Sequence, residues 1–462
     1  MRRMACHVLW FKRDLRLHDH AALVHAAQCA AADGSPVLCL YALEPSLWAQ
    51  PDAAALHYAF LRECLQDLQQ ELQAQGGDLL LWVGEVLPAL DWLQQRVGVA
   101  ALHTHQETGN AHTYARDRAV ARWCRTHRVP WHEQVQFGVL RPLRQRSQWL
   151  PHWQTQMARP TLPLPTQVRW ASAWGLVQKG AGEALGLATD YATFRVADLP
   201  PASAFGLDPW VAPLRQRGGR QQALQDWERF AHSGSAAYRG GISEALMQGR
   251  TGWPMVDACV AMLRQTGWLN FRMRAMLVSV AAYPLWLHWR EVGLWLARHF
   301  LDYEPGIHWS QMQMQAGTTG INATRVYNPV KQAQDHDPQG QFVRHWLPAM
   351  RRVPDAWLFE PWRMPHSVQA HCGVQVGVDL ALPLVELQAA TRSAKARLHA
   401  RRAQPEVRAA KAAIVERHGS RKAPFARKGG SPAAAQGSVQ GSAQRSAHAA
   451  PSSGPQQMAL DF

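Results

Sequence analysis

Over residues 7–133, short apolar runs alternate with amphipathic stretches, and this alternation narrows the possible folds more than any other feature. Five apolar runs are typical of buried strands: residues 7–11, 36–42, 79–83, 101–105 and 129–132. Four stretches between them carry apolar side chains at helical spacing: residues 21–31, 57–74, 86–97 and 110–127. Strands and helices in strict alternation predict a parallel sheet wound with helices on both faces. The region has neither a GxGxxG motif nor a Walker-type loop, which disfavours the usual dinucleotide and triphosphate enzymes.

After residue 133 the pattern changes. Prolines are scattered through residues 134–208, which predicts a long connecting segment. From residue 209 to 390 helical periodicity replaces the strand pattern and predicts an all-α domain. Its helices are expected at residues 221–231, 254–266, 270–283 and 285–300. The expected fold is therefore an α/β domain over residues 1–133, followed by a linker and a helical domain.

Residues 391–462 form a basic tail. They hold thirteen Lys and Arg against three Asp and Glu, so +10 of the chain's net charge of +15 lies here. Residues 393–418 are compatible with a basic helix, whereas residues 428–455 have almost no large apolar side chains and are expected to be disordered. The tail either tethers DNA or is a solvated extension. Any nucleic-acid interface on the folded domains has to rest on local patches of charge.

Cysteine usage and hydropathy limit the compartment and the partners. The seven cysteines are widely spaced and include no CxxC pair, so we expect no disulfide framework, zinc ribbon or iron–sulfur cluster, and no metal. No apolar run is long enough to span a membrane. We therefore expect a reduced, cytoplasmic protein. A monomer is a separate expectation. The 21 tryptophans indicate either large aromatic cores or stacking against a chromophore or a base.

One group of chemically useful residues follows the first strand, in the sequence WFKRDLRL at residues 10–17. Charged groups at the carboxyl end of a sheet strand lie where α/β proteins form ligand sites. The alternative is a solvated loop in which Asp14 pairs with an arginine.

A second group lies between two predicted helices, in GRTGWPMVDA at residues 249–258 and GWLNFRMRAML at residues 267–277. Asn270 and Arg274 are four residues apart and share a helix face. Together they could bind the edge of a planar ligand. The alternative is that Arg274 is paired with a structural carboxylate.

A third group is LDYEPGIHW at residues 301–309. Asp302 follows a predicted helix, where a carboxylate is unfavourable to the helix dipole unless a partner needs it. Arg274 or an N–H group of a ligand is the expected partner, and a solvated C-terminal turn is the alternative.

Taken in order, these motifs resemble those of the cryptochrome/photolyase family, and of a bacterial photolyase-like branch in particular. The resemblance covers most of residues 5–365 and also includes these shorter motifs: HWRE, RVYNP and FVRHWLP. It implies an N-terminal α/β domain that can hold an antenna chromophore of unknown type, and a helical domain that holds FAD. In such proteins the cofactor supplies the chemistry, while the protein supplies position and electrostatics.

The resemblance also implies roles for individual residues in binding the cofactor. Tyr238 is similar to a tyrosine that touches the FAD phosphates, and Arg274 to an arginine beside the flavin ring. Asp302 resembles the carboxylate that accepts from a flavin N–H. Asn270 and Gly306 occupy further positions next to the flavin.

Tryptophans are implied in electron transfer. Trp289 is similar to the middle tryptophan of a photoreduction chain, and Trp286, Trp295 and Trp309 could extend it. Packing in a core is the alternative for each of them, and is favoured for Trp295.

On the DNA side, Arg325 resembles a DNA-facing arginine. Arg272 and Met312 fall at further positions expected to face DNA, where an arginine can neutralise phosphate.

The sequence departs from the family pattern at several of these positions. Phe271 stands where the family usually carries Asn beside the flavin and the lesion. Gly306 is the nearest match to the residue opposite the flavin N5, and it offers no side chain. The lesion-clamping tryptophan is replaced by Met312, and the proximal relay tryptophan by Ser310 or, with a slip of one residue, Trp309.

A larger departure is an apparent internal deletion. Only residues 244–248 lie between Ser243 and Gly249, where the family normally has several dozen further residues, including the loop that cradles the FAD diphosphate. Each lost charge-assisted hydrogen bond is worth about 1.5–3 kcal/mol, so the affinity for FAD is expected to be reduced.

The leading hypothesis is a flavoprotein that repairs pyrimidine lesions in DNA by light-driven electron transfer, a carbon–carbon lyase if FAD is bound. The second hypothesis is a photoreceptor that does not repair DNA, and the third is a nucleic-acid-binding remnant without flavin. Repair predicts affinity selective for lesions, whereas the remnant predicts salt-sensitive binding that weakens without the tail.

Overall fold

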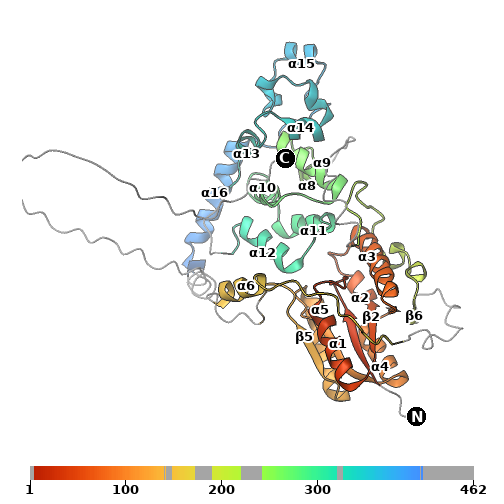
Figure 1. Cartoon of the computed structure of the whole chain (residues 1–462). Coiled ribbons are helices and arrows are strands. Elements are labelled where there is room, and N and C mark those ends of the chain that lie inside the picture. Colours follow the sequence, from red (N-terminus) through yellow and green to blue (C-terminus); the bar gives the residue numbers. More distant parts are fainter. Residues whose placement is uncertain are drawn as a thin grey trace, which may run out of the picture. The chain divides into compact units, whose positions relative to one another are not determined.

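The structure is a computed structural model (Figure 1). It describes residues 5–139, 141, 148–171, 190–219, 242–319, 326–405 and 407–408. All of them belong to one unit of the chain, residues 1–420. Several predictions lie outside the described residues: Tyr238, Arg325, the helix at 221–231 and the tail after residue 408.

A six-stranded sheet organises the first part of the chain. Its strands are β1 (Cys6–Phe11), β2 (Val37–Leu43), β3 (Leu79–Val83), β4 (Val99–His105), β5 (Trp131–Gln134) and β6 (Tyr191–Thr193). The spatial order is β5-β4-β1-β2-β3-β6. The first five strands pair in parallel, as predicted, and β6 pairs antiparallel with β3. The strand order reverses at β1 and β4, where ligand crevices form in such sheets.

Helices cover both faces of this sheet, which confirms the predicted winding (Figure 1). They are α1 (Ala21–Asp33), α2 (Pro45–Trp48), α3 (Ala55–Ala74), α4 (Val86–Arg96) and α5 (Ala111–His127). In β1, Leu9 and Phe11 face one core with residues of α1 and α3, while Val8 and Trp10 face the other with residues of α4 and α5. The four-residue helix α2 was not predicted, because it is too short to show a period.

Part of the segment predicted as a linker belongs to the sheet. It contains α6 (Trp149–Met157), β6 and the short 3₁₀ helices η2 (Val196–Asp198) and η3 (Ala202–Phe205). Trp170 bridges to Val37 of β2, and β6 adds the antiparallel edge strand. A three-residue strand leaves no alternation in the sequence, so the pattern could not reveal it.

The second part of the chain is helical, and the described residues after 209 contain no β-strand. Its α-helices are α8 (Ile242–Met247), α9 (Pro254–Thr266), α10 (Phe271–Ala282), α11 (Trp289–His299), α12 (Pro305–Gln315), α13 (Pro329–His336), α14 (Gln341–Trp346), α15 (His366–Cys372) and α16 (Leu387–Ala403). Three 3₁₀ helices lie between them: η4 (Pro348–Arg352), η5 (Asp355–Trp357) and η6 (Pro361–Arg363). One continuous core joins α9, α10, α11 and α14, with Trp253, Met276, Leu296 and Trp346 among its members.

The turn before α9 shows why this part of the sequence folds locally as it does. The buried Asp257 carboxylate accepts from the backbone N and Oγ1 of Thr251, both at 2.7 Å, and from Gly252 N at 3.0 Å. Burial outweighs these bonds and raises the pKa of Asp257 to about 6. Gly252 has φ +80°, and a Cβ there would lie 2.3 Å from the backbone carbon of Leu382. A glycine is therefore required at this close approach.

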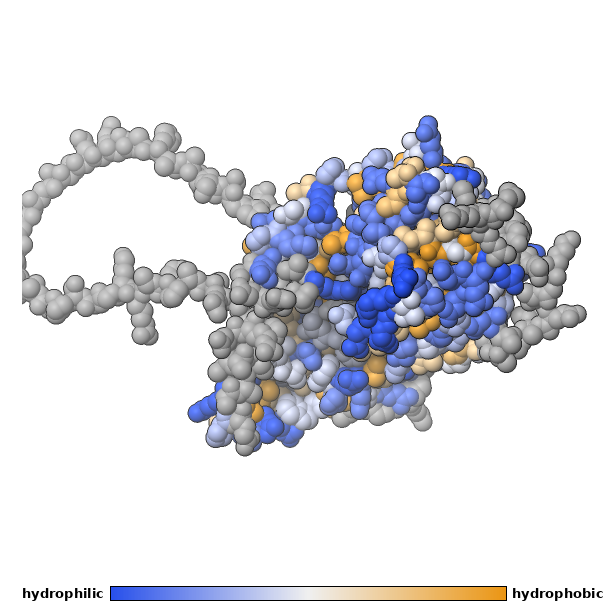
Figure 2. Space-filling model, turned by 90° about the horizontal axis from the view of Figure 1, so that it is seen from below, coloured by the Kyte–Doolittle hydropathy of each residue, from blue (hydrophilic) through white to orange (hydrophobic). Residues whose placement is uncertain are grey.

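In the described part of the chain no helix is both long and apolar enough to cross a membrane. Figure 2 shows a face on which hydrophilic residues predominate and apolar residues appear in several small areas between them.

Candidate functional site

An ion pair joins two of the residues predicted to bind the cofactor. Arg274 lies in the first turn of α10, and its Nη2 donates to Asp302 Oδ2 at 2.9 Å. Its Nε donates to the Leu269 carbonyl at 2.7 Å, and its guanidinium lies over the Phe300 ring, 4.1 Å from the centroid. This confirms the expected pairing of Asp302 with Arg274. The Asp302 side chain is 51 % exposed, so the carboxylate remains open to a ligand.

The other two described residues predicted next to the flavin have structural roles. Asn270 is the N-cap of α10, and its Oδ1 accepts from Met273 N. Gly306 is the second residue of α12, and a Cβ there would lie 3.2 Å from the Thr108 carbonyl oxygen. Glycine therefore allows the start of α12 to approach the loop after β4 closely.

Two of the predicted relay tryptophans are in ring contact. The rings of Trp289 and Trp309 lie edge to face with centroids 6.2 Å apart, and Trp309 Nε1 donates to the Tyr303 hydroxyl at 3.1 Å. Trp286 is 46 % exposed and its ring lies under Arg397 of α16, at 5.2 Å. Trp295 packs against the helical core, which agrees with the alternative expected for it.

His308 lies near this group and was missed by the sequence prediction. It is buried, and its Nε2 is 2.8 Å from the Gly293 carbonyl. Burial, with the nearby Arg274 charge, lowers the pKa of His308 to about 4, so its ring is neutral at pH 7. Its ring also contacts Trp309, with centroids 5.1 Å apart. Its place between the predicted Gly306 and Met312 was the only signal in the sequence.

Of the two described residues predicted to face DNA, one is exposed and the other is buried. Arg272 is exposed in the first turn of α10, next to Phe271, which is 60 % exposed. Met312 is 3 % exposed and belongs to the helical core. DNA could not touch Met312 without a change in packing, because α12 buries it against α11.

The shortened segment borders a cavity of about 450 Å³ between α8, α9 and α11. Glu244 and Gln248 line it on one side, and Arg264, Trp295 and His299 line it on the other. Burial lowers the pKa of His299 to about 4.

The motif after β1 contacts both parts of the unit. Arg13 forms an ion pair with Glu304 at 2.7 Å and donates to the Tyr303 carbonyl. The buried Asp14 is bonded to His20 and His105, and not to an arginine as the alternative held. Burial raises the pKa of Asp14, but its interactions with His20 and its hydrogen bond to His105 outweigh this effect and hold the pKa well below its usual value.

A buried cluster of charges lies at the carboxyl ends of β1, β2 and β4. Arg116 of α5 pairs with Glu44 at 2.7 Å, with Glu107 at 2.8 Å and with Asp117 at 3.0 Å. Asp117 also pairs with Lys12 at 2.9 Å. The cluster thus joins three carboxylates to two cations, and Arg116 is the cation that all three carboxylates share.

Comparison with known protein families covers most of this structure. Residues 7–147 match the model of a DNA photolyase domain, and residues 216–400 match the FAD binding domain of DNA photolyase. The chain belongs to the photolyase/cryptochrome family. The N-terminal sheet and the C-terminal helices are therefore the two domains of that family, as the resemblance implied.

Individual relatives include both branches of the family. The chain is 26 % identical to a cryptochrome DASH from Gloeobacter violaceus, over 82 % of this chain and 93 % of the relative. It is 22 % identical to a deoxyribodipyrimidine photo-lyase from Alkalihalophilus pseudofirmus, over 82 % and 94 %. A crystal structure of an archaeal photolyase from Sulfolobus tokodaii with two FAD molecules has the same fold, with a TM-score of 0.66 at 18 % identity, covering 86 % of this chain and all of that one.

The residues present fit the edge of a flavin. The Asp302 oxygen that does not accept from Arg274 has no hydrogen-bond partner among the described residues. Gln311, one turn after His308 on α12, has an Oε1 that is buried without a partner in the described structure. A buried acceptor without a donor is a group that a ligand N–H can satisfy. The second Asp302 oxygen is therefore an acceptor beside Arg274 that a flavin N–H could satisfy, and Gln311 offers a further acceptor on α12.

Proposed function

We propose that this protein repairs pyrimidine lesions in DNA by light-driven electron transfer from reduced FAD held in its helical part. The observation that carries the proposal is the Arg274–Asp302 ion pair next to the Trp289–Trp309 ring contact. The ion pair offers a positive and a negative group to the polar edge of a flavin. The two tryptophan rings offer a path for electrons towards the flavin. Bound FAD would supply the electron transfer itself.

The residues around Asp302 determine what the protein contributes. Arg274 donates to Asp302 through a charge-assisted hydrogen bond, and the Phe300 ring lies against the guanidinium. Asp302 then accepts from a flavin N–H with its second oxygen. The neutral His308 places an uncharged ring beside these groups, so it adds no charge to the Arg274–Asp302 pair.

Trp289 and Trp309 are proposed to conduct electrons towards the flavin. Their rings are in contact, and the Nε1 bond of Trp309 to Tyr303 keeps its orientation fixed. Electron transfer of this kind needs aromatic rings in near contact, and a fixed orientation preserves that contact.

Lesion-containing DNA is the proposed substrate. Arg272 is an exposed cation at the start of α10, only two residues from Arg274, and we assign it a DNA phosphate. The exposed Phe271 ring beside it offers a face for stacking an unpaired base. An antenna chromophore in the α/β part is a further proposal, supported by the second FAD of the Sulfolobus tokodaii photolyase.

Flavin content is the first test of this function. The protein is purified in the dark, its absorbance is recorded from the near ultraviolet to the red, and released flavin is quantified. We expect FAD to copurify, and Asp302→Ala to reduce the FAD retained while the circular dichroism of the chain is unchanged. Equal FAD content in the variant would refute the placement of the flavin at Asp302.

Repair is tested separately, with the loaded protein, blue light and an oligonucleotide that carries one pyrimidine dimer. Loss of the dimer in the light but not in the dark is the expected result. Light-dependent flavin changes without repair, and without preference for the lesion, would instead favour a photoreceptor, a role that its cryptochrome relatives make the main competitor.

A further inference from the structure

A cluster of histidines occupies the face of the sheet beneath α1. His7 of β1, His103 of β4 and His132 of β5 lie on this face, and His103 is directly opposite His132 in the β4–β5 register. Helix α1 adds His25 and Cys29. Such positions between a helix and a parallel sheet normally hold branched apolar side chains, because the space is buried on both sides. Histidine and cysteine side chains in this place therefore need an explanation other than core packing, such as a bound ion.

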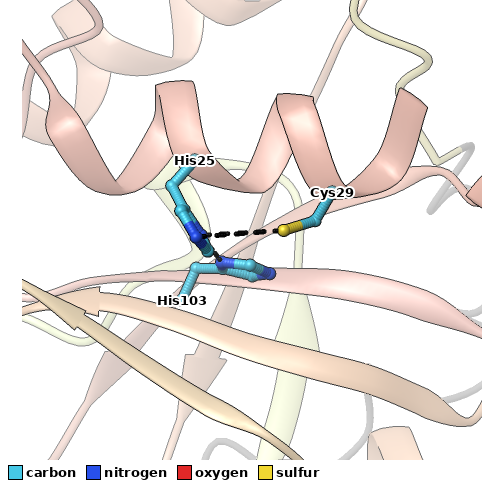
Figure 3. A group of neighbouring side chains, drawn as sticks. All are labelled: His25, Cys29 and His103. Carbon is cyan, nitrogen blue, oxygen red and sulfur yellow. Dashed lines mark hydrogen bonds between the residues drawn. The ribbon is translucent and has the colours of Figure 1, made fainter. Parts of the chain in front are cut away.

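We propose that His25, Cys29 and His103 bind a divalent transition metal ion, with zinc as the preferred ion. The three side chains point toward one another between α1 and β4 (Figure 3). One ligand atom from each lies within 4.8 Å of the other two. Two imidazole nitrogens and one thiolate are a ligand set that zinc commonly takes.

Two of the three ligand distances are close to those around a tetrahedral ion, and the third, between Cys29 Sγ and His103, is within 4.8 Å. His25 Nδ1 and His103 Nδ1 are 3.2 Å apart, and Cys29 Sγ is 3.7 Å from His25 Nδ1. With zinc–nitrogen bonds of about 2.05 Å and a zinc–sulfur bond of about 2.3 Å, tetrahedral angles require about 3.3 Å between two nitrogens and about 3.6 Å between nitrogen and sulfur. The side chains could therefore accept the ion with only small shifts.

The backbone places these ligands without strain. His25 and Cys29 are four residues apart on α1, so they project from the same face of the helix. His103 projects from β4 and is completely buried, which fixes its ring from below. His25 and Cys29 are partly exposed, which leaves an ion a path from solvent.

A chain of hydrogen bonds orients the buried ligand. His103 Nε2 is 2.9 Å from His7 Nδ1, and His7 Nε2 is 2.9 Å from Asp33 Oδ2. If each ring donates toward the Asp33 carboxylate, His103 carries its proton on Nε2 and presents a bare Nδ1 lone pair to the ion. Metal-bound histidines usually have a partner of this kind on their second nitrogen.

The ring of His132 lies close enough to complete the site. Its centroid is 4.7 Å from that of His25, and it stacks on His103 at 5.1 Å. Either His132 after a ring rotation or a water molecule would fill the fourth position. An open fourth position is common in zinc sites that are not purely structural.

A second group of potential metal ligands is not assigned an ion. Asp14, His20 and His105 also lie within reach of one ion. However, His20 Nδ1 accepts from Leu23 N as the N-cap of α1, and Asp14 accepts from Lys12 N and from His105. The same Asp14 oxygen lies 3.0 Å from His20 Nε2 and 2.5 Å from His105 Nδ1, so the carboxylate itself serves both rings and we assign no metal there.

The experiment measures metal binding by the whole chain, independently of flavin. The protein is stripped with a chelator, incubated with Zn²⁺, and passed through a column with a weak competing chelator, because 22 histidines will also bind zinc loosely. We expect one ion retained per chain. Cys29→Ala and His25→Ala should each weaken the apparent affinity about a hundredfold or more, and Asp33→Asn, which acts through His7, should weaken it less than either.

Controls separate the site from general effects. Cys64→Ala removes a partly buried thiol on α3, outside the cluster, and should retain the ion. With Co²⁺, the wild-type protein should show the thiolate charge-transfer band, and Cys29→Ser should lose it. Circular dichroism and thermal midpoints without metal check that the variants remain folded. Wild-type protein that retains no ion, or variants that retain it as well as wild type, would overturn the proposal and leave a hydrogen-bonded core only.

Discussion

Replacing Arg116 with methionine removes the shared cation of the buried carboxylate cluster and keeps a side chain of comparable length. Two of its three partners retain other donors: Asp117 keeps Lys12 at 2.9 Å, and Glu107 keeps two backbone N–H groups. Among the described residues, Glu44 keeps a single backbone donor at 3.3 Å. The variant therefore leaves one carboxylate, Glu44, buried and uncompensated.

The expected magnitude follows from that one charge. Removing one partner of a buried ion pair costs about 3–5 kcal/mol. Burial already raises the pKa of Glu44 although Arg116 is present, and without Arg116 it will rise further. A carboxyl group whose folded-state pKa lies above its unfolded value is destabilising at high pH, and protonation relieves the penalty as pH falls. The loss should therefore be largest near about pH 8 and smaller near about pH 5.

Native-state hydrogen exchange of the β1 and β2 amides measures this loss as the opening free energy of the sheet, without assuming that the whole chain unfolds in one step. Arg118→Met, at an exposed position on the same helix, is the matched control. Adding Glu44→Gln to Arg116→Met should recover at least half of the loss. A loss below about 1 kcal/mol, as for a surface ion pair, or an equal loss at both pH values would refute the reasoning.

Three further predictions concern the helical part and the turns. Trp289→Phe should slow photoreduction of the flavin without lowering flavin content, whereas Trp295→Phe should leave the rate unchanged; transient absorption compares the two. Gly252→Ala should lower the thermal midpoint clearly more than Gly34→Ala, because both have positive φ but only Gly252 faces backbone within 4 Å; equal shifts would contradict a steric cause. His308 has a pKa of about 4 when folded and about 6.5 when unfolded, so its contribution to stability is complete above about pH 6.5 and is lost as pH falls towards 4. Thermal midpoints of His308→Gln should therefore fall less steeply with acidification than those of wild type.

The strands and helices that a sequence predicts well are those with a long, regular apolar pattern. The predicted helix at residues 254–266 has the same bounds as α9, and β3 coincides with its predicted run. The antiparallel strand β6 was missed because three residues contain no period. Strand β6 pairs with the free edge of β3, and that edge exists only in the assembled sheet.

The site was predictable only where its residues lie in recognisable motifs. The expected pairing of Asp302 with Arg274 is confirmed, since both follow recognisable helix ends. The burial of Met312 was not foreseen, because a resemblance transfers a position and not its packing. The group of His25, Cys29 and His103 was also missed, and the prediction that no metal binds rested on cysteine spacing alone. Its members are brought together by strand order, which no local motif encodes.

The segment that carries Asp302 is fastened to the α/β part immediately after that residue. The Tyr303 hydroxyl donates to Asp52, and Arg13 holds both the Tyr303 carbonyl and the Glu304 carboxylate. A ligand that binds Asp302 therefore binds a carboxylate on an already ordered backbone. The protein loses less conformational entropy when the ligand binds. By reciprocity, such a ligand also stabilises the contacts of the loop after β1, so binding at Asp302 is thermodynamically linked to the contacts between the helical part and the α/β part.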